Sequence, residues 1–571
     1  MQNNSLQSTF NRFRTVLQIL VIACLCAPCV VFAQQQRKPA ARGPVQQKRL
    51  TPAQQRYNEG VAWANKGKLN EAIAAFRQSI QADAKFYEGY MALAIALQQA
   101  QQPAEAAGIL RQAVNLRPQQ VDAHYYLGTV LQQLNDADGA LAEYRAAVKL
   151  NPNAAPLHAA VGFILAAQSK FTEAIPEFEK AVKLQPTLGE AHYYLGLARL
   201  LSGDTKGAVT ALRQAVRFAP KNPNALLQLG LALQESGDTR GALNNLQAAA
   251  KLAPESFEIQ YALGRAYQRD EDSEAAVAAF RAVLKLNPDY VPAYSDLGLS
   301  LVNQRDPDGA LVALTEGLRR EPSNAIVLHN LGMAYIQKGD LDAALVQYRR
   351  LIEIAPQDAE AHYNLALALK QKDDLEGAAN SLRQAIALQP TLAEAHFTLG
   401  VILLQQAKLD EAAAAFQATI AVKKDYSEAY YTLGTVRQQQ GQSNAAIAAF
   451  REALRYAPDA PEIHNTLGTA LRQKGETEAA RAEFQEAARL NKIKSDRQAA
   501  TFALNTGLAH LKAGKLPEAL ERFRAAIALD ANNAQAYYNL AKTLQAQGKK
   551  AEATAAYQKA KQLDPRTKPL T

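Results

Sequence analysis

One exact period in the sequence constrains the fold of this chain more than any other feature. Glycine or alanine recurs at the spacing that separates Gly60 from Ala94, as far as Gly468 and, after one step lengthened by five residues, again at Gly507 and Ala541. Fifteen units therefore cover residues 53–567. A chain of 571 residues would ordinarily form several globular domains, but repeats of this kind stack on their neighbours and share one elongated core.

Fixed positions within each unit predict a pair of antiparallel helices. An alanine follows the reference glycine or alanine at a constant distance, and an aromatic residue or leucine follows that alanine by four, as in Gly60, Ala72 and Phe76. Eight units have glycine at the turn between the helices, which suits a left-handed backbone. Eleven units have a proline near their end, such as Pro118, where it stops the second helix. We expect the small residues to let the two helices approach closely and the large residue to fill the adjoining space.

These features resemble the tetratricopeptide repeat (TPR) family. Residues 359–392 read AEAHYNLALALKQKDDLEGAANSLRQAIALQPTL, and residues 121–154 read VDAHYYLGTVLQQLNDADGALAEYRAAVKLNPNA; both follow the family's consensus almost throughout. The resemblance implies an all-α fold, a right-handed α-solenoid superhelix of about 15 helix-turn-helix TPR units. It also implies that the first helix of each unit lines a concave groove.

The predicted organisation follows from the repeats and the N-terminal composition. We expect a signal peptide at 1–33, a basic Gln/Pro-rich linker at 34–52, TPR repeats 1–13 at 53–494, an insertion at 495–499, repeats 14–15 at 500–567 and a tail at 568–571. The insertion accounts for the longer step between Gly468 and Gly507, and it predicts a lengthened helix or a loop.

The N-terminus has the pattern of an export signal. Arg12 and Arg14 precede an apolar run that ends at Ala33, which predicts cleavage there and an exported, periplasmic or secreted protein. Two alternatives stay open. The residues up to Cys24 resemble a bacterial lipobox, which would make the protein a lipoprotein, and the apolar run is near the length of an uncleaved membrane anchor. All three cysteines lie in this run, so cleavage would remove every thiol.

The location of the charge disfavours nucleic acid as a partner. The net charge is +9, but seven basic residues and no acidic ones lie in residues 1–52, so the repeats carry only +2. A nucleic-acid-binding protein concentrates basic side chains on its folded surface. We expect no nucleic-acid partner, and contact with a membrane only through a possible N-terminal anchor.

Repeated polar residues are expected to be structural. Glutamates such as Glu71, Glu173, Glu411 and Glu518 precede the fixed alanine and would stabilise helix N-termini. Histidines at one repeat position would lie about 10 Å apart in neighbouring repeats, too far to share a metal ion. These histidines are His124, His158, His192, His362, His396 and His464. No metalloprotease, phosphate-loop, nucleophile-elbow or dinucleotide motif occurs, so we expect no catalytic residue, no metal, no cofactor and no enzymatic activity.

One stripe of each first helix is the candidate binding surface. By the family resemblance, positions 5, 9 and 12 of the repeat face the groove. Position 5 is often tyrosine and position 12 often glutamine, a pair that offers apolar area and amide hydrogen bonds to an extended polypeptide. The candidates are Tyr125, Tyr193, Tyr261, Tyr363, Tyr431, Gln132, Gln234, Gln268 and Gln438.

The sequence therefore predicts a non-enzymatic scaffold that binds a protein or peptide partner in the concave TPR groove, in a bacterial cell envelope. Two further functions stay open: a periplasmic TPR component of polysaccharide export or envelope assembly machinery, and an adaptor that recruits substrates for a separate glycosyltransferase. A purely architectural role is also compatible with the pattern.

Overall fold

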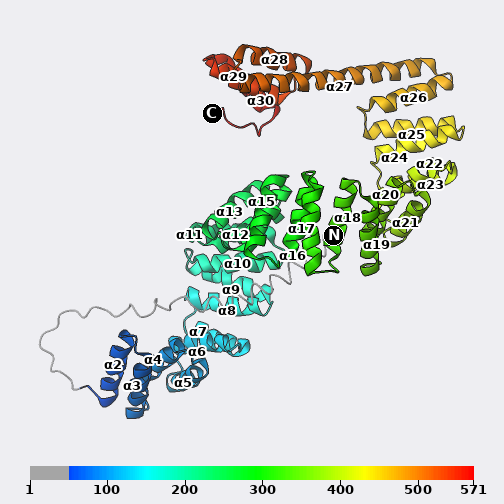
Figure 1. Ribbon diagram of the computed structural model, residues 1–571. Coiled ribbons are helices and arrows are strands. Elements are labelled where there is room, and N and C mark those ends of the chain that lie inside the picture. Colours follow the sequence, from blue (N-terminus) through cyan, green and yellow to red (C-terminus); the bar gives the residue numbers. More distant parts are fainter. Residues whose placement is uncertain (1–49, 571) are drawn as a thin grey trace. The chain divides into compact units, whose positions relative to one another are not determined.

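The computed structural model describes residues 50–570, and Figure 1 shows them as helices joined by short turns. The predicted signal peptide and most of the predicted linker lie outside the described residues. No strand occurs between residues 50 and 570, and the helices follow one another in pairs, which confirms the all-α solenoid. The chain divides into two compact units, which meet in sequence between Arg320 and Glu321.

The first unit contains the helices of repeats 1–8. These are α2 (Pro52–Asn65), α3 (Leu69–Ala82), α4 (Tyr87–Gln99), α5 (Pro103–Leu116), α6 (Val121–Gln133), α7 (Ala137–Leu150), α8 (Ala155–Ala167), α9 (Phe171–Leu184), α10 (Gly189–Leu201), α11 (Thr205–Phe218), α12 (Pro223–Glu235), α13 (Thr239–Leu252), α14 (Phe257–Arg269), α15 (Ser273–Leu286), α16 (Val291–Asn303) and α17 (Pro307–Arg320).

The second unit contains the helices of repeats 9–15. These are α18 (Ala325–Lys338), α19 (Leu341–Ile354), α20 (Ala359–Gln371), α21 (Leu375–Leu388), α22 (Ala393–Gln405), α23 (Leu409–Val422), α24 (Ser427–Gln439), α25 (Ser443–Tyr456), α26 (Pro461–Gln473), α27 (Thr477–Lys512), α28 (Leu516–Leu529), α29 (Ala534–Ala546) and α30 (Lys550–Leu563).

The array begins slightly earlier than the repeat pattern predicts. Thr51 caps α2: its hydroxyl accepts a hydrogen bond from the Gln54 backbone amide, and the Gln54 side chain accepts one from the Thr51 amide. This reciprocal pair satisfies two backbone donors that a helix start otherwise leaves unpaired. Thr51 and Pro52, expected in the linker, therefore belong to the first helix and its cap.

The close approach of the two helices in each repeat depends on the reference glycine. A Cβ atom added at Gly400 would lie 2.7 Å from a ring carbon of Phe416, and one at Gly434 would lie 2.5 Å from Phe450. Both phenylalanines are fully buried. The predicted role of the small and large residues is confirmed, because the ring occupies the space that a side chain would need.

The turns between paired helices also follow the prediction. All eight turn glycines have a positive φ, as do Asn135 and Asp373 at the same place in their repeats. Five other residues adopt this conformation where the sequence has neither glycine nor Asn/Asp; they are Gln101, Ser169, Glu271, Arg305 and Ala407. The turn is therefore imposed by helix pairing even where the local residue disfavours it.

Position 4 of the repeat, counted from Ala53, fastens one repeat to the next. In several repeats the side chain there donates a hydrogen bond to the backbone carbonyl six residues earlier, at the end of the preceding repeat. Leu226 and Leu328, which have no donor, occupy the position in repeats 6 and 9. Examples are His192 to the carbonyl of Pro186 at 2.9 Å and Tyr294 to that of Pro288 at 3.0 Å. The carbonyls at the end of a helix lack partners within that helix, and a side chain of the following helix supplies one here.

The predicted insertion is helical. Instead of a turn, residues 495–499 continue the second helix of repeat 13 into the first helix of repeat 14, and the resulting α27 has 36 residues. In Figure 1, α27 is the long helix between α26 and α28. Repeats 14 and 15 consequently have an apolar core of their own, built around Leu504, Phe523 and Leu540.

Candidate functional site

Three tyrosines of the candidate stripe, Tyr125, Tyr261 and Tyr431, lie against an aromatic ring on the second helix of their own repeats. Ring centroids are 5.8 Å apart for Tyr125 and Tyr144, and the same distance separates Tyr431 from Phe450. Tyr125, Tyr363 and Tyr431 are half-buried, whereas Tyr193 is only 7% exposed. Each ring thus contributes packing and presents at most one edge to solvent.

Tyr261 has the most polar surroundings of the five tyrosines. Its ring packs on Phe280 at 5.8 Å and meets Tyr290 edge-on at 5.1 Å between ring centroids. Burial, followed by the nearby Asp296 carboxylate, raises the pKa of the Tyr261 hydroxyl far above its ordinary value. The hydroxyl therefore stays protonated and remains a hydrogen-bond donor at any physiological pH.

Three of the four candidate glutamines bond within the chain. Gln132 accepts from the Tyr144 hydroxyl at 3.2 Å, and the Gln438 amide donates to the Gln473 side chain at 2.9 Å. The Gln268 amide nitrogen donates to the Asp296 carbonyl at 3.0 Å and to the Ser300 hydroxyl at 2.9 Å, both in the next repeat. Two of these amides, Gln268 and Gln438, therefore already link repeats.

Gln234 differs from these three. Its amide nitrogen Nε2 is buried and has no hydrogen-bond partner among the described residues. An unsatisfied buried donor is unfavourable by about 1–3 kcal/mol. Gln234 is therefore the candidate whose hydrogen-bonding capacity is least used by the repeat array.

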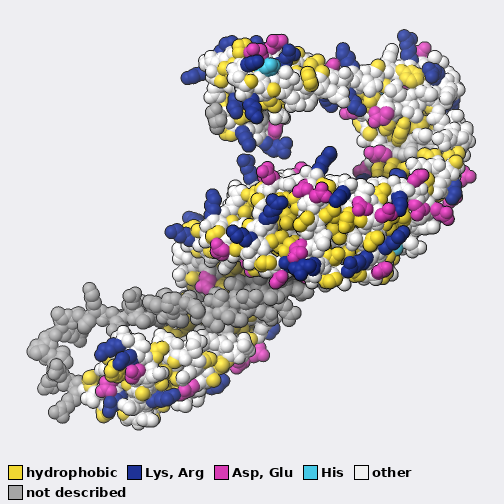
Figure 2. All heavy atoms as spheres, in the orientation of Figure 1, with side chains coloured by type: hydrophobic (Ala, Val, Ile, Leu, Met, Phe, Trp, Pro, Cys, Tyr) yellow, Lys and Arg dark blue, Asp and Glu magenta, His cyan; other side chains and the backbone are white. Residues whose placement is uncertain are grey.

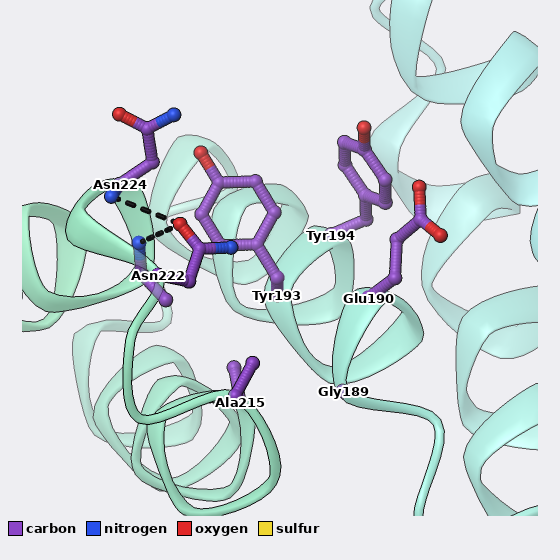
Figure 3. A pocket seen from close by; sticks show the side chains of 9 residues that line it. Gly189, Glu190, Tyr193, Tyr194, Ala215, Asn222 and Asn224 are labelled. Atoms are coloured by element: carbon purple, nitrogen blue, oxygen red, sulfur yellow. Dashed lines mark hydrogen bonds between the residues drawn. The ribbon is translucent and has the colours of Figure 1, made fainter. Parts of the chain in front are cut away.

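A pocket of about 300 Å³ lies beside this stripe, at the joint between repeats 5 and 6, and Tyr193 is the stripe residue that lines it. In the close view of Figure 3, Tyr193 stands between Tyr194 and Glu190 on one side and Asn222 and Asn224 on the other. Glu190 and Asn224 are exposed and form the rim. Asn222 caps α12 through two backbone amides and is held in place by them. The wall is mostly apolar, and the polar groups at its edge offer an amide, a carboxylate and a hydroxyl.

Sequence reasoning did not single out Glu190, Asn222 or Asn224. Asn222 was recognisable as the residue before a proline that begins a helix, which is a typical N-cap. Glu190 and Asn224 occupy position 2 of their repeats, next to the stripe, and only the packing of neighbouring first helices brings them together. Burial also raises the pKa of the Glu190 carboxyl above its ordinary value, although its edge is exposed.

The histidine ladder is structural, with hydrogen bonds in addition to the expected packing. Nδ1 of His124 lies 2.6 Å from the Glu143 carboxylate on the second helix of the repeat, and Nε2 lies 3.0 Å from the Pro118 carbonyl. The pairs His158–Glu177 and His464–Glu483 repeat this arrangement. In repeats 5 and 11 the carboxylate is replaced by alanine.

The glutamates before the fixed alanine also link repeats. Glu105 pairs with Arg77 of the preceding repeat at 2.6 Å, and Glu173 lies 3.6 Å from Arg145 in the same way. These side chains are largely exposed, so each pair contributes modestly to stability.

Residues 50–570 can also be compared with the requirements of a metal site and of a membrane span. Among residues 50–570, no three His, Cys, Asp or Glu side chains are grouped closely enough to hold a metal ion. No helix in that same range is long and apolar enough to span a bilayer. Figure 2 shows basic and acidic side chains interspersed over the face in view.

Comparison with known proteins identifies the repeat. Family models described as TPR repeat match residues 332–373, 367–407 and 507–548, and models described as tetratricopeptide repeat match residues 91–155, 164–223, 227–291, 431–496 and 534–567. Together these matches span more than half of the chain. Among curated proteins, none matches.

Several solved structures also match parts of the chain. YrrB, described as a TPR protein with an unusual peptide-binding site, is 22% identical over 33% of this chain and 96% of its own, with a TM-score of 0.31. MamA is 28% identical over 28% and 95%, with a TM-score of 0.27. Yeast Tom70 is 16% identical over 68% and 96%, with a TM-score of 0.36.

TM-scores this low support no transfer of a ligand from these proteins, so the family assignment rests on the repeat models and on the helix pairs described above. The chain belongs to the tetratricopeptide repeat family, whose arrays generally act as non-catalytic scaffolds for protein–protein interaction.

Proposed function

We propose that the first-helix stripe of the first unit binds an extended segment of a partner polypeptide. The observation that carries this proposal is the pocket beside Tyr193, which adjoins the predicted stripe through that residue and has the size and apolar wall suited to one inserted side chain. An aromatic or branched aliphatic side chain would bury its surface there. The rim groups Glu190 and Asn224 would bond to the adjoining backbone.

Gln234 supports the same proposal from the other end of α12. Its Nε2 is buried and lacks a partner among the described residues, so a bound segment would satisfy this donor with a backbone carbonyl once the Gln234 side chain turns outward. One helix thus has an apolar pocket near its start and an unpaired amide near its end. An extended polypeptide that follows α12 would meet both.

Blocking the pocket tests this proposal. Asn224 is exposed and its side chain is free to be enlarged, so Asn224→Trp would cover the pocket without disturbing the core. Asn244→Trp, at an exposed position of the second helix α13, is the matched control. A peptide library displayed on phage and selected on the purified protein should lose its enriched sequences with Asn224→Trp and keep them with Asn244→Trp. Equal enrichment on both variants would contradict the proposal.

We also propose that the protein is exported to the bacterial cell envelope. Support comes from Arg12 and Arg14, the apolar run and Ala33 in the sequence. N-terminal sequencing of protein from fractionated cells would find Gln34 first in a periplasmic or secreted fraction. A lipid-modified Cys24 would favour the lipoprotein alternative, and an intact N-terminus in the membrane fraction would favour the anchor.

A further inference from the structure

The two halves of α27 expose the surfaces through which neighbouring repeats stack on each other elsewhere in the chain. Position 3 of the repeat packs on the preceding repeat: a Cβ at Gly89 would lie 2.9 Å from Ile80 and 3.0 Å from the Ser79 hydroxyl, at positions 28 and 27 of repeat 1. This position is buried in every repeat from the second onward except repeat 14, where Phe502 is 76% exposed. Repeat 14 therefore presents the surface of a first repeat.

The other half of α27 has the reciprocal property. The large residue at position 24 is buried in repeats 1–12 and 14, but Phe484 in repeat 13 is only half-buried, as is Tyr557 in repeat 15 at the end of the array. Ala488, at position 28, is exposed. Repeat 13 therefore presents the surface of a last repeat, although two more repeats follow it.

The sizes of the exposed residues match each other across this interrupted joint. In most joints a large residue at position 28 meets a small one at position 3, as with Ile420 and Ala429, while three joints pair two large residues, as with Leu454 and Ile463. Between repeats 6 and 7 the sizes are reversed, and Ile259 packs beside the small Ala250. The pair Ala488 and Phe502 has this reversed pattern, with a still larger residue at position 3. Complementary sizes indicate two surfaces that meet.

These two surfaces cannot meet within one chain. Ala488 and Phe502 lie about four turns apart on one continuous helix, which separates them by about 21 Å along its axis. A second copy has the same two surfaces and offers each of them the surface it lacks. Because a regular joint places the two helices antiparallel, a single two-fold axis near Ser495 would bring both pairs together.

We propose that the chain forms a two-fold dimer in which the α27 helices of two copies pack antiparallel. Phe502 of each copy then lies against Ala488 of the other, and Phe484 faces Thr506. Each half of the dimer reproduces the contact that stacked repeats make elsewhere in the chain. This surface is separate from the first-helix stripe, so the dimer does not depend on the proposed function.

Two polar residues set the strength of the contact. Arg481 occupies position 21, where Ile447 of the preceding repeat is buried, and Thr506 occupies position 7, where Leu467 is buried. Polar groups make both surfaces compatible with water when the copies are apart. The dimer is therefore reversible and depends on protein concentration.

Sedimentation equilibrium of the purified protein over a wide concentration range tests the dimer. The wild type should shift from the mass of one chain to that of two as concentration rises, and Phe502→Asp should remain a single chain. Val312→Asp, which changes a side chain that is 74% exposed on α17, should behave as the wild type. A wild type that stays a single chain throughout, or a dimer unaffected by Phe502→Asp, would overturn the proposal.

A size exchange tests the specific contact. Ala488→Ile overfills the contact with Phe502, and Phe502→Ala leaves it underfilled, so each should weaken dimerisation several-fold or more. The double variant restores the pair found at Ile420 and Ala429 and should recover the dimer. Additive losses in the double variant would show that these residues do not meet. Because both side chains are exposed in a single chain, none of these variants should change the helix content.

Discussion

Two successive joints between repeats differ in whether the neighbouring repeats stack on each other. Between repeats 12 and 13, α25 ends at Tyr456, the chain turns, and the first helix of the next repeat packs back, so that Phe450 is 0% and Ile463 is 5% exposed. Between repeats 13 and 14 there is no turn, and the equivalent residues Phe484 and Phe502 remain accessible. Stacking therefore depends on the joint as much as on the repeats that it connects.

Loss of the terminal proline does not account for this difference. Lys492 stands where Pro458 ends repeat 12, but Lys424 stands at the same place in repeat 11, and the chain still turns there between Val422 and Ser427. The five extra residues are what distinguishes the joint. They add more than one helical turn without a glycine or proline, so continuing the helix satisfies the backbone hydrogen bonds that a turn would leave open.

The largest expected effect separates the buried and half-buried phenylalanines. Phe450→Ala should destabilise repeats 12 and 13 by about 3–5 kcal/mol, because it leaves a cavity beside Gly434. Phe484→Ala should cost less than half as much, since its ring is already partly in water. Hydrogen exchange of the α25 and α26 amides under mild denaturant measures both changes. Equal losses would mean that the α27 joint is as tightly packed as a regular one.

Deleting residues 495–499 should convert the irregular joint into a regular one. The deletion restores the regular period, so the chain should turn and bury Phe502 on repeat 13, a gain of about 1.5–3 kcal/mol for repeats 14 and 15. Hydrogen exchange in α28 should slow, and dimerisation should disappear. Replacing residues 495–498 with alanine, next to the existing Ala499, should keep α27 continuous. If the deletion variant exchanges as fast as the alanine variant, the insertion is not what prevents stacking.

Removing the position 4 side chain should weaken a regular joint more modestly. His464 lies 2.6 Å from the Glu483 carboxylate and 3.0 Å from the Pro458 carbonyl. His464→Ala should therefore destabilise the joint by about 2 kcal/mol, because it removes the ring contacts to both the carboxylate and the carbonyl. His192 has alanine in place of the glutamate, and His192→Ala should have about half that effect. Urea midpoints of the single variants report the difference; equal shifts would show that the carboxylate contributes nothing.

The smallest expected effect is a pH dependence of the folding stability around α18. Burial lowers the pKa of His329 below its ordinary value of 6.5. The unfolded chain therefore binds this proton more readily, so stability from the neutral ring is present above about pH 6.5 and is lost as pH falls towards the folded pKa. His329→Phe, the residue type at the same position in Phe397, should flatten this loss in denaturation at successive pH values. An unchanged pH profile would assign the loss to other groups.

The repeats were predictable because each one restates the same local rules. Gly400 and Phe416 are near each other in sequence and lie in one helix pair, so the period alone places them in contact without any knowledge of the rest of the fold. The same holds for the turn glycines. The cap at Thr51 was missed because its residues had been assigned to the linker on composition alone.

Parts of the candidate site were less predictable. Hydrogen bonds of Gln268 to the next repeat, and the absence of such a partner for Gln234 among the described residues, depend on side chains in other repeats. The pairing of His124 with Glu143 required knowing which of many surface glutamates faces it. For the insertion, the sequence allowed a helix or a loop. A continuous helix keeps its backbone hydrogen bonds but loses the stacking of repeat 14 on repeat 13, and the sequence does not show which of these two free energies is larger. The tyrosine and glutamine stripe as a binding surface stays a prediction.

Mechanically, α27 is a rigid segment of about 54 Å within an array that is otherwise extensible. A stacked array under tension lengthens by opening contacts between neighbouring repeats, each of which can close again when the load falls. A single helix has no such contacts to open. α27 would therefore transmit tension from repeats 14 and 15 to repeat 13 without lengthening. The contacts between stacked repeats on either side of α27 would separate first.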